Sequence, residues 1–274
     1  FSSLSINNFK TETLALPVQC LINSQSYLAI NYQRLARLRP DYGYFNLDPK
    51  SVDLNELTHD GVWKYEIEHN RHQLLYSLRS IVMASGVCID QTMTKHKVNH
   101  LLMAPDKFRF AMIHRQFAAG KRSGYLLIGD IEGGPLTRLS TGRIVSHYCW
   151  MSNAELLVFM DGESGFRYYM INTRTGHARP LMELAGPASR DGHPTDLGSN
   201  RFVADTYPDR FGYQSLFLGN AVSGSTEILA VLKHPSNYSG IARCDLHPRT
   251  KPGFDYGFID SVYSGTRRQY RFKI

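Results

Sequence analysis

The sequence predicts an all-β fold, and within that class a β-propeller built of four-stranded blades. One pattern recurs along the chain: a polar residue, a short apolar strand, a turn that begins four residues after the polar residue, and a second strand. The residues that start these repeats are Gln19, His100, His147, His193 and His247. From His100 onward the starts lie about 50 residues apart, which is typical of propeller blades with four strands each.

The repeat around residues 97–113 is the best defined. Residues 97–103 and 108–113 are predicted strands, and Pro105-Asp106 lies in the turn between them because Pro presets φ and Asp bonds back to the backbone. The second half of each unit holds a further strand, polar turn and strand. These outer pairs are residues 63–68 with 73–78, 124–131 with 136–139, 166–172 with 178–182, and 215–219 with 227–232.

The repeats predict five full blades and part of a sixth. Residues 3–9 and 11–16 have the pattern of the outer pair of a preceding blade. We therefore expect residues 1–274 to form a single β-propeller domain. It either closes as a small propeller or, as we favour, covers part of a larger one with further N-terminal blades. Two long insertions interrupt the pattern, residues 33–60 and residues 80–98, and residues 80–85 suit a short helix.

The first insertion holds three arginines and two tyrosines, namely Arg34, Arg37, Arg39, Tyr42 and Tyr44. Two interpretations stay open. The residues form a platform for an anion or a sugar, or they belong to a packed loop whose arginines pair with nearby acidic residues. We favour the packed loop slightly.

Composition excludes some classes of protein and leaves others open. The chain has 274 residues, 42% hydrophobic and 20% charged, which suits a globular protein with a substantial core. No stretch reaches the roughly 18 apolar residues of a membrane span. The net charge of +7 suits an acidic ligand or a basic solvated surface, and the dispersed Lys and Arg residues do not predict nucleic-acid binding. The four cysteines contain no Cys-x-x-Cys pair, so they predict no disulfide framework.

Repeat symmetry predicts a cluster of side chains at one mouth of the propeller axis. The residues that start the first strands would lie beside those that end the second strands, because the two strands are antiparallel. The first set contains four histidines, and a purely structural position would favour apolar or small residues instead. The second set is Gln33, His114, Asp161, Tyr207 and Val262.

Two chemistries can use such a cluster. Metal binding is predicted for His193, Cys244 and His247, with Asp205 or Asp191 as a possible fourth ligand, and this soft set favours zinc over calcium or magnesium. Proton transfer is the other chemistry, because histidine titrates near neutral pH and arginine binds carboxylates. The candidates are His100, His114, His147 and Tyr207, with Arg167 or Arg210 to hold an anion.

Several motifs at the repeat positions resemble those of the propeller polysaccharide lyases, the oligogalacturonate and ulvan lyases. They are Asn99-His100 with His114-Arg115, Ser146-His147-Tyr148, Asp191-Gly192-His193-Pro194, Asp205-Thr206-Tyr207-Pro208-Asp209, and Cys244-Asp245-Leu246-His247-Pro248-Arg249. The resemblance implies seven blades and a metal beside the axis, which His193, Cys244 and His247 would hold. Cys244 replaces an amide of those enzymes, which favours zinc over manganese.

For function, the resemblance implies β-elimination at a uronic acid within an acidic oligo- or polysaccharide. His100 and His114 match the catalytic positions best, while His147, Arg167 and Tyr207 (or Tyr148) follow from geometry. The alternative is a non-catalytic propeller that binds an acidic glycan or a protein, in which zinc only joins blades. The compartment stays open: periplasmic or secreted for a lyase, otherwise cytoplasmic.

Overall fold

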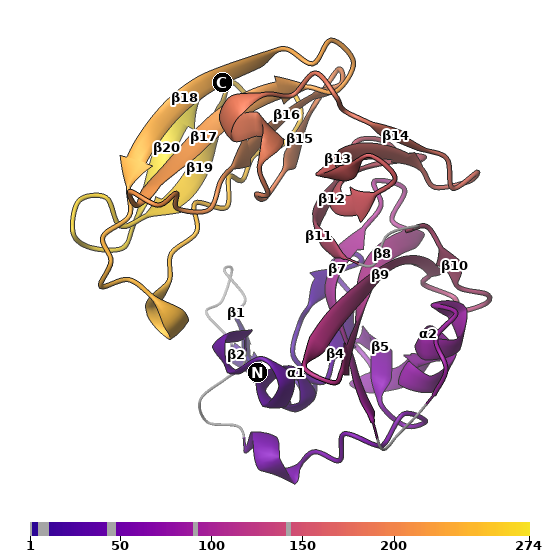
Figure 1. Ribbon diagram of the computed structural model, residues 1–274. Coiled ribbons are helices and arrows are strands. Elements are labelled where there is room, and N and C mark those ends of the chain that lie inside the picture. The colour runs from indigo at the N-terminus through magenta and orange to yellow at the C-terminus, as the bar shows by residue number, and fades with distance from the viewer. Residues whose placement is uncertain (1, 5–10, 43–47, 90–92, 141–143) are drawn as a thin grey trace. The chain divides into compact units, whose positions relative to one another are not determined.

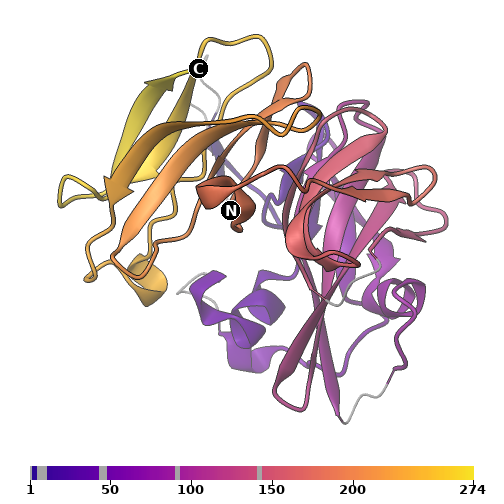
Figure 2. The same cartoon turned by 45° about the horizontal axis from the view of Figure 1, so that its top comes forward.

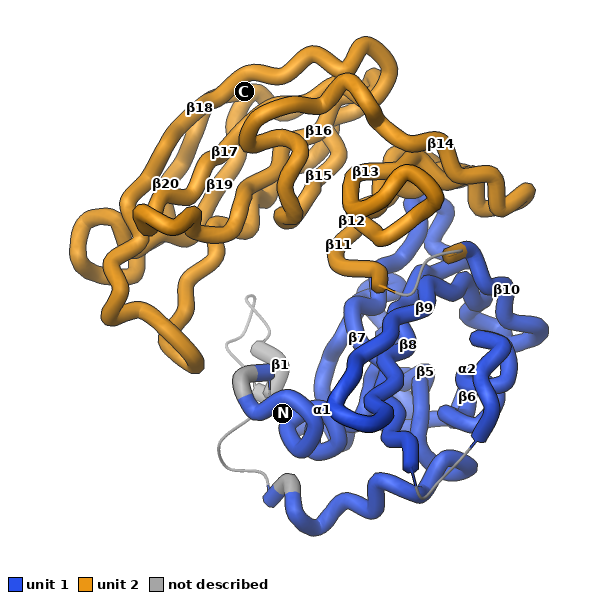
Figure 3. The backbone as a smooth tube through the Cα atoms, viewed as in Figure 1, with its two compact units in different colours: residues 1–139 blue, residues 140–274 orange. Residues whose placement is uncertain are grey.

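The computed structural model describes residues 2–4, 11–42, 48–89, 93–140 and 144–274. The strands are antiparallel, and four sheets have four strands each (Figure 1). This is a β-propeller with four-stranded blades, as the sequence predicted. The chain divides into two compact units, residues 1–139 and 140–274 (Figure 3). That both units belong to one propeller domain stays a prediction.

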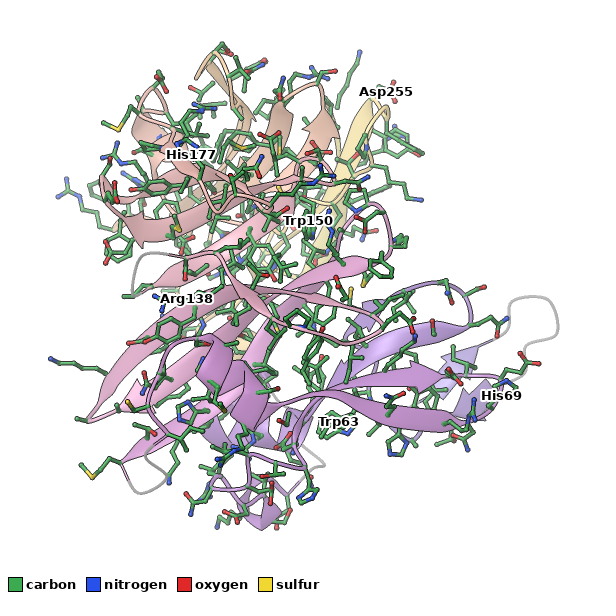
Figure 4. All side chains as sticks on the ribbon, turned by 90° about the vertical axis from the view of Figure 1, so that its right-hand side faces the viewer. Trp63, His69, Arg138, Trp150, His177 and Asp255 are labelled. Carbon is green, nitrogen blue, oxygen red and sulfur yellow. The ribbon has the colours of Figure 1, made fainter. Side chains whose placement is uncertain are left out.

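The first unit contains a two-stranded sheet and two blades. Strands β1 (Ser2–Leu4) and β2 (Thr11–Thr13) pair antiparallel, as expected for the outer strands of a preceding blade. In each of the two blades, neighbouring strands in the sheet are also consecutive along the chain. Their bounds are β3 (Cys20–Leu21), β4 (Ser26–Ile30), β5 (Gly61–Glu66) and β6 (Arg71–Ser77), then β7 (Thr94–Met103), β8 (Arg109–Ala118), β9 (Lys121–Asp130) and β10 (Thr137–Arg138). Figure 4 labels His69 at the tip of the β5–β6 hairpin and Arg138 on β10.

The second unit contains two four-stranded blades and one two-stranded sheet, seen again from another side in Figure 2. The 3₁₀ turns η3 (Gly186–Ser189) and η4 (Gly240–Ala242) precede the second and third sheets. The strands are β11 (Val145–Trp150), β12 (Glu155–Gly162), β13 (Gly165–Asn172), β14 (Ala178–Pro180), β15 (Thr195–Gly198), β16 (Arg201–Asp205), β17 (Tyr213–Asn220), β18 (Thr226–Lys233), β19 (Tyr256–Ser261) and β20 (Arg268–Lys273).

The prediction of five full blades is corrected to four among the described residues. In the sheet that follows His247, only β19 and β20 form a ladder, and the predicted first strand is reduced to a single bridge between Arg249 and Phe258. Pro248 and Pro252 flank the bridge, and proline has no N–H to donate to a ladder. The local sequence therefore prevents a longer first strand.

Helices occupy the two insertions. Helix α1 (Tyr32–Leu38) begins where the Asn31 side chain accepts a hydrogen bond from the backbone N–H of Arg34, and 3₁₀ turns η1 (Pro40–Tyr42) and η2 (Pro49–Ser51) follow. The predicted short helix of the second insertion is α2 (Leu78–Ala84), which Ser77 caps in the same manner. No helix in the described part of the chain has the length and apolar character needed to cross a membrane.

The first insertion is a packed loop at its start. Arg34 is almost fully buried, and its guanidinium donates to the carboxylate of Asp60 and to the backbone carbonyls of Leu54, His96, Asp53 and Glu56. These contacts join α1 to the following loop and to β7. Tyr44 lies outside the described residues.

Each unit has its own core. The second strands of the blades are buried almost along their full length, as β4, β12 and β16 show, whereas the outer strand β18 is largely exposed. In the second unit, Leu246 packs with Leu197, Val203, Leu216 and Ile259 between the last two sheets. This packing fixes the chain segment that carries His247.

Candidate metal centre

Three of the repeat histidines gather in the second unit. His147 lies on β11, His193 precedes β15, and His247 precedes the bridge residue Arg249. The ring centroids of His147 and His193 are 4.2 Å apart, and those of His193 and His247 are 3.7 Å apart. The repeat pattern thus brings together three of the four histidines that it singled out.

A buried carboxylate organises two of these histidines. Asp205, at the end of β16, has no exposed surface and accepts hydrogen bonds from the backbone N–H groups of His193, at 2.6 Å, and His247, at 2.9 Å. Its two oxygens also lie 2.9 and 3.0 Å from Nδ1 of His193. Gly192 makes this approach possible, because a Cβ at that position would lie 1.7 Å from the Asp205 carbonyl oxygen.

Asp205 also sets the charge and orientation of His193. Burial alone would lower the pKa of His193, but the hydrogen bond and negative charge of Asp205 outweigh it and raise that pKa. Burial would raise the pKa of Asp205, but the hydrogen bond and charge of His193 hold it below its ordinary value. With Nδ1–H bonded to the carboxylate, Nε2 of His193 is the nitrogen that can bind a metal.

His193, Asp245 and His247 form a group with the geometry of a metal site. One ligand atom from each lies within 4.8 Å of the other two. His247 is exposed at the surface, but the atoms packed around its ring and the positive charge of His193 lower its pKa to about 4, so the ring is neutral at neutral pH, as a metal ligand must be.

Asp245 carries an oxygen that a metal would satisfy. Its side chain is buried; Oδ2 lies 2.8 Å from Nη2 of Arg243, while Oδ1 has no hydrogen-bond partner among the described residues. A buried oxygen without a donor costs about 1–3 kcal/mol. Two imidazoles and this carboxylate fit a divalent transition metal ion.

The third ligand of the group is Asp245, whereas the sequence predicted Cys244. The ligand atoms that converge are those of His193, Asp245 and His247, while Cys244 Sγ lies 4.0 Å from the backbone carbonyl of Asp245. The Cys244 thiol is buried, burial raises its pKa, and Arg267 lies beside it. The structure therefore groups two of the three predicted ligands with Asp245. The Asp-x-His spacing was the signal that sequence reasoning overlooked.

His147 forms a second arrangement beside the metal group. Its Nδ1 lies 3.0 Å from Oδ1 of Asp191, and Ser146 Oγ donates to Oδ2 of Asp191 at 2.5 Å. Its Nε2 lies 3.4 Å from the hydroxyl of Tyr207. Burial lowers the pKa of His147, although Asp191 opposes this, so the ring is a neutral acceptor facing Tyr207. Asp191 and Asp205, the predicted alternatives for a fourth ligand, instead bond to Nδ1 of His147 and His193.

Arg243 connects the two arrangements. Its guanidinium pairs with Asp245, and its Cζ lies 5.3 Å from the centre of the Tyr207 ring. The side chain is about one-third exposed, at 33%. No feature of the repeat pattern pointed to Arg243, because it lies outside the repeated positions.

His114, predicted to be catalytic, is completely buried in the first unit. Ser85 Oγ donates to the carbonyl of Ile81, so it accepts from Nδ1–H of His114 at 2.8 Å. Nε2 of His114 then accepts from Nδ1 of His96 at 3.0 Å, and Thr94 Oγ1 lies 3.0 Å from Nε2 of His96. Burial lowers the pKa of His114 to about 3. This chain of hydrogen bonds ties α2 to β7 and β8 and occupies both ring nitrogens of His114.

His100 lies in a different setting from His114. It occupies an irregularity of the β7–β8 pairing, has a left-handed φ of 55°, and its ring is 6.4 Å from that of Tyr42. Tyr42 also lies 4.6 Å from Cζ of Arg39 and 5.7 Å from Nζ of Lys97. The two histidines therefore have separate surroundings.

The remaining predicted residues make their contacts elsewhere in the second unit. Arg167, on β13, donates to the carbonyl of Ser164 at 2.8 Å and to Sδ of Met182 at 2.7 Å. Arg210 stacks on Phe211, with its Cζ 4.6 Å from the ring centre. Tyr148 is buried within β11.

Comparisons with known proteins support the fold. No protein-family model and no curated protein matches the sequence. A solved oligogalacturonate lyase in complex with manganese is similar over 100% of this chain and 71% of its own, with 13% identity and a TM-score of 0.59. A putative TolB from Agrobacterium tumefaciens is similar over 76% of this chain and 64% of its own, with 13% identity and a TM-score of 0.50. A prolyl endopeptidase is similar over 99% of this chain and 35% of its own, with 9% identity and a TM-score of 0.56. At these identities the likeness shows the β-propeller fold alone.

Proposed function

We propose that the second unit binds one divalent transition metal ion through His193, Asp245 and His247, and that the protein cleaves an acidic, uronate-containing oligosaccharide by β-elimination. The observation that carries the proposal is the convergence of three ligand atoms within 4.8 Å. The hydrogen bonds that the Asp205 carboxylate accepts from His193 orient one of these ligands. A solved propeller of similar fold is a manganese-bound oligogalacturonate lyase, which supports the same reading.

The nature of the metal follows from the donor set. Two imidazole nitrogens and a carboxylate oxygen suit zinc or manganese, and replacing the thiolate of Cys244 by Asp245 removes the reason to prefer zinc. When bound, the ion would offset the negative charge of a uronate carboxylate and so make the adjacent C–H more acidic.

Tyr207 and His147 are the groups we assign to proton transfer. Nε2 of His147 accepts the phenol proton of Tyr207, and Asp191 holds the ring by bonding to Nδ1. The positive charge of Arg243 over the ring stabilises the phenolate. The Tyr207 oxygen then takes the proton α to the carboxylate, and the electron pair of that C–H bond forms the C=C bond as the glycosidic C–O bond breaks. The departing oxygen takes the proton from Tyr207, and His147 returns the phenol proton at the end of the cycle.

A lyase assay tests the proposal. Oligomers of galacturonate and ulvan-like and glycosaminoglycan substrates are incubated with manganese- or zinc-loaded protein, and the absorbance of the unsaturated product is followed. Tyr207→Phe and His147→Gln should each lower turnover roughly 10²–10⁴-fold, the range for a positioned acid or base. Arg174→Met, at an exposed arginine in the turn after β13, is the matched control and should keep wild-type turnover. Equal turnover in Tyr207→Phe and wild type would reject this assignment.

A second function is favoured by one specific observation. Asp205 bonds to the backbone of both His193 and His247, which belong to consecutive sheets, so a metal at this site would also join two blades. In that case the protein binds an acidic glycan without cleaving it, and the metal is structural. Removal of the metal with a chelator would then lower the melting temperature sharply, while every uronate polymer tried would bind without giving unsaturated product.

A further inference from the structure

We propose that the loop between β16 and β17 is a second binding site, which takes a further sugar unit of an acidic oligosaccharide bound at the metal group. This inference rests on the proposed function and extends it to the length of the ligand. It starts from two exposed aromatic rings, Phe211 in the loop and Tyr213 at the start of β17, each of which has a cation stacked on it.

Hydrogen bonds fix the conformation of this loop. The Asp209 carboxylate accepts from the backbone N–H groups of Phe211, at 2.8 Å, and Tyr213, at 2.9 Å. The backbone N–H of Gly212 donates to the carbonyl of Asp209 at 2.9 Å, and Gly212 has the left-handed φ of 77° that suits glycine. Nζ of Lys233 donates to the carbonyl of Phe211 at 2.5 Å. The backbone of Phe211 is therefore held in place although its ring is exposed.

The two rings offer apolar faces next to positive charges. Phe211 is 61% exposed and Tyr213 is 43% exposed. Cζ of Arg210 lies 4.6 Å from the centre of the Phe211 ring, and Nζ of Lys233 lies 4.6 Å from the centre of the Tyr213 ring. Single exposed rings are common on any protein, whereas neighbouring exposed rings on one fixed loop are typical of a binding surface.

An acidic sugar fits this pairing of ring and cation. The face of an aromatic ring is the negative part of its quadrupole, so it attracts the C–H bonds on the flat side of a pyranose. The charged group of the sugar would lie beside the cation, and the exposed Arg210 has no hydrogen-bond acceptor among the described residues. A neutral sugar would use only the ring, and a simple anion would use only the cation.

The loop lies within reach of the proposed reaction site. Phe211 follows Tyr207 by four residues, and four residues of fully extended chain span at most about 14 Å. An oligosaccharide of a few units can bridge such a distance, whereas a single sugar cannot. Binding should therefore become tighter as the oligosaccharide becomes longer.

The experiment measures the binding of galacturonate and of trigalacturonate by calorimetry with manganese present. All variants carry Tyr207→Phe, so that the trimer is not cleaved. To this background are added Phe211→Ala, Phe211→Trp and Arg210→Met, and Phe254→Ala is the matched control, because Phe254 is also exposed, at 48%, and lies ahead of β19.

We expect the trimer to bind more tightly than the monomer. Phe211→Ala should weaken trimer binding about 3–10-fold, which corresponds to one stacked ring, and Phe211→Trp should restore it. Arg210→Met should also weaken trimer binding, and the loss should be larger at low salt than at high salt. Monomer binding should stay the same in all variants, and Phe254→Ala should bind the trimer as its parent does.

Several outcomes would overturn the inference. They are equal trimer affinity in Phe211→Ala and Phe254→Ala, a trimer that binds no more tightly than the monomer, and no binding of either. Equally tight binding of maltotriose, which has no charge, or of a thymidine oligonucleotide would show a surface that does not select acidic sugars and would overturn it too. A protein with natural Tyr207 that cleaves trigalacturonate with the same KM in the presence and absence of Phe211→Ala would refute this inference and leave the proposed function in place. Length-dependent binding without any unsaturated product would refute the lyase activity alone.

Discussion

The buried hydrogen-bond chain through His114 should make the protein sensitive to acid, and His114→Gln should reduce that sensitivity. The pKa of a histidine in an unfolded chain is about 6.5, and burial lowers the pKa of His114 to about 3. Because the folded pKa is depressed, the stability contributed by the neutral ring is complete above about pH 6.5 and is lost as the pH falls toward the folded pKa. Each pH unit below 6.5 costs about 1.4 kcal/mol, so the loss between pH 7 and pH 5 is about 2 kcal/mol.

The neighbours of His114 also disfavour its protonated form. His96 and Arg115 both oppose a second positive charge, Tyr125 stacks on the ring, and every ring nitrogen of the chain already has a partner in the neutral form. Glutamine does not titrate, but it cannot satisfy both Ser85 and His96 in the same geometry. His114→Gln should therefore be less stable at pH 7 by about 1–3 kcal/mol and lose less stability on acidification.

Urea unfolding of metal-free protein at pH 8, 7, 6 and 5 measures this, with circular dichroism and tryptophan fluorescence as probes. His69→Gln, at the exposed tip of the β5–β6 hairpin (Figure 4), is the matched control and should follow wild type. The pKa values of His96, His147 and His247 are lowered as well, so the wild-type slope contains more than His114. The difference between wild type and His114→Gln reports His114 together with its hydrogen-bonded partner His96. Identical slopes for wild type and His114→Gln would refute the reasoning.

Three further predictions concern residues that support the fold and the metal group. Arg34→Met should cost about 3–5 kcal/mol in unfolding free energy, because it leaves the buried Asp60 carboxylate without its cation, and Arg71→Met, an exposed pair, should cost under about 1 kcal/mol. Asp205→Asn should weaken metal binding roughly 10–100-fold, as measured by calorimetry. An amide has one oxygen, so it cannot accept hydrogen bonds from the backbone N–H of His193, the Nδ1–H of His193 and the backbone N–H of His247 together. An unchanged dissociation constant would contradict this. Gly192→Ala should lower the melting temperature more than Gly176→Ala, a turn glycine with open space around it, because its Cβ would lie 1.7 Å from a backbone oxygen; equal shifts would refute the packing argument.

The spacing of the repeats predicted both the blades and the grouping of three histidines. Equal offsets in successive sheets place residues at equivalent positions, so His147, His193 and His247 meet although about 50 residues separate them. Tyr207 also followed from its offset, because it comes just after the end of β16.

The repeat pattern does not specify the direction in which a side chain points or the distant residues that contact it. The choice between Cys244 and Asp245 depends on which way each side chain points from a segment that belongs to no strand, in which His247 has a left-handed φ of 43°. The burial of His114 depends on Ser85, which an insertion supplies from 29 residues away. Arg34 had several acidic residues in reach along the sequence, and only the packed loop selects Asp60 and the carbonyls that it binds.

The most direct test of the metal centre is the metal content of the protein. We expect protein purified without chelator and equilibrated with manganese or zinc to hold close to one ion per chain by mass spectrometry with elemental detection. The double variant His193→Ala/His247→Ala should hold none, and Asp245→Asn should bind the ion more weakly. Cys244→Ser should keep the ion, because Cys244 is not among the three residues whose ligand atoms converge there. Wild type without metal, or a double variant that keeps a full equivalent, would contradict the account.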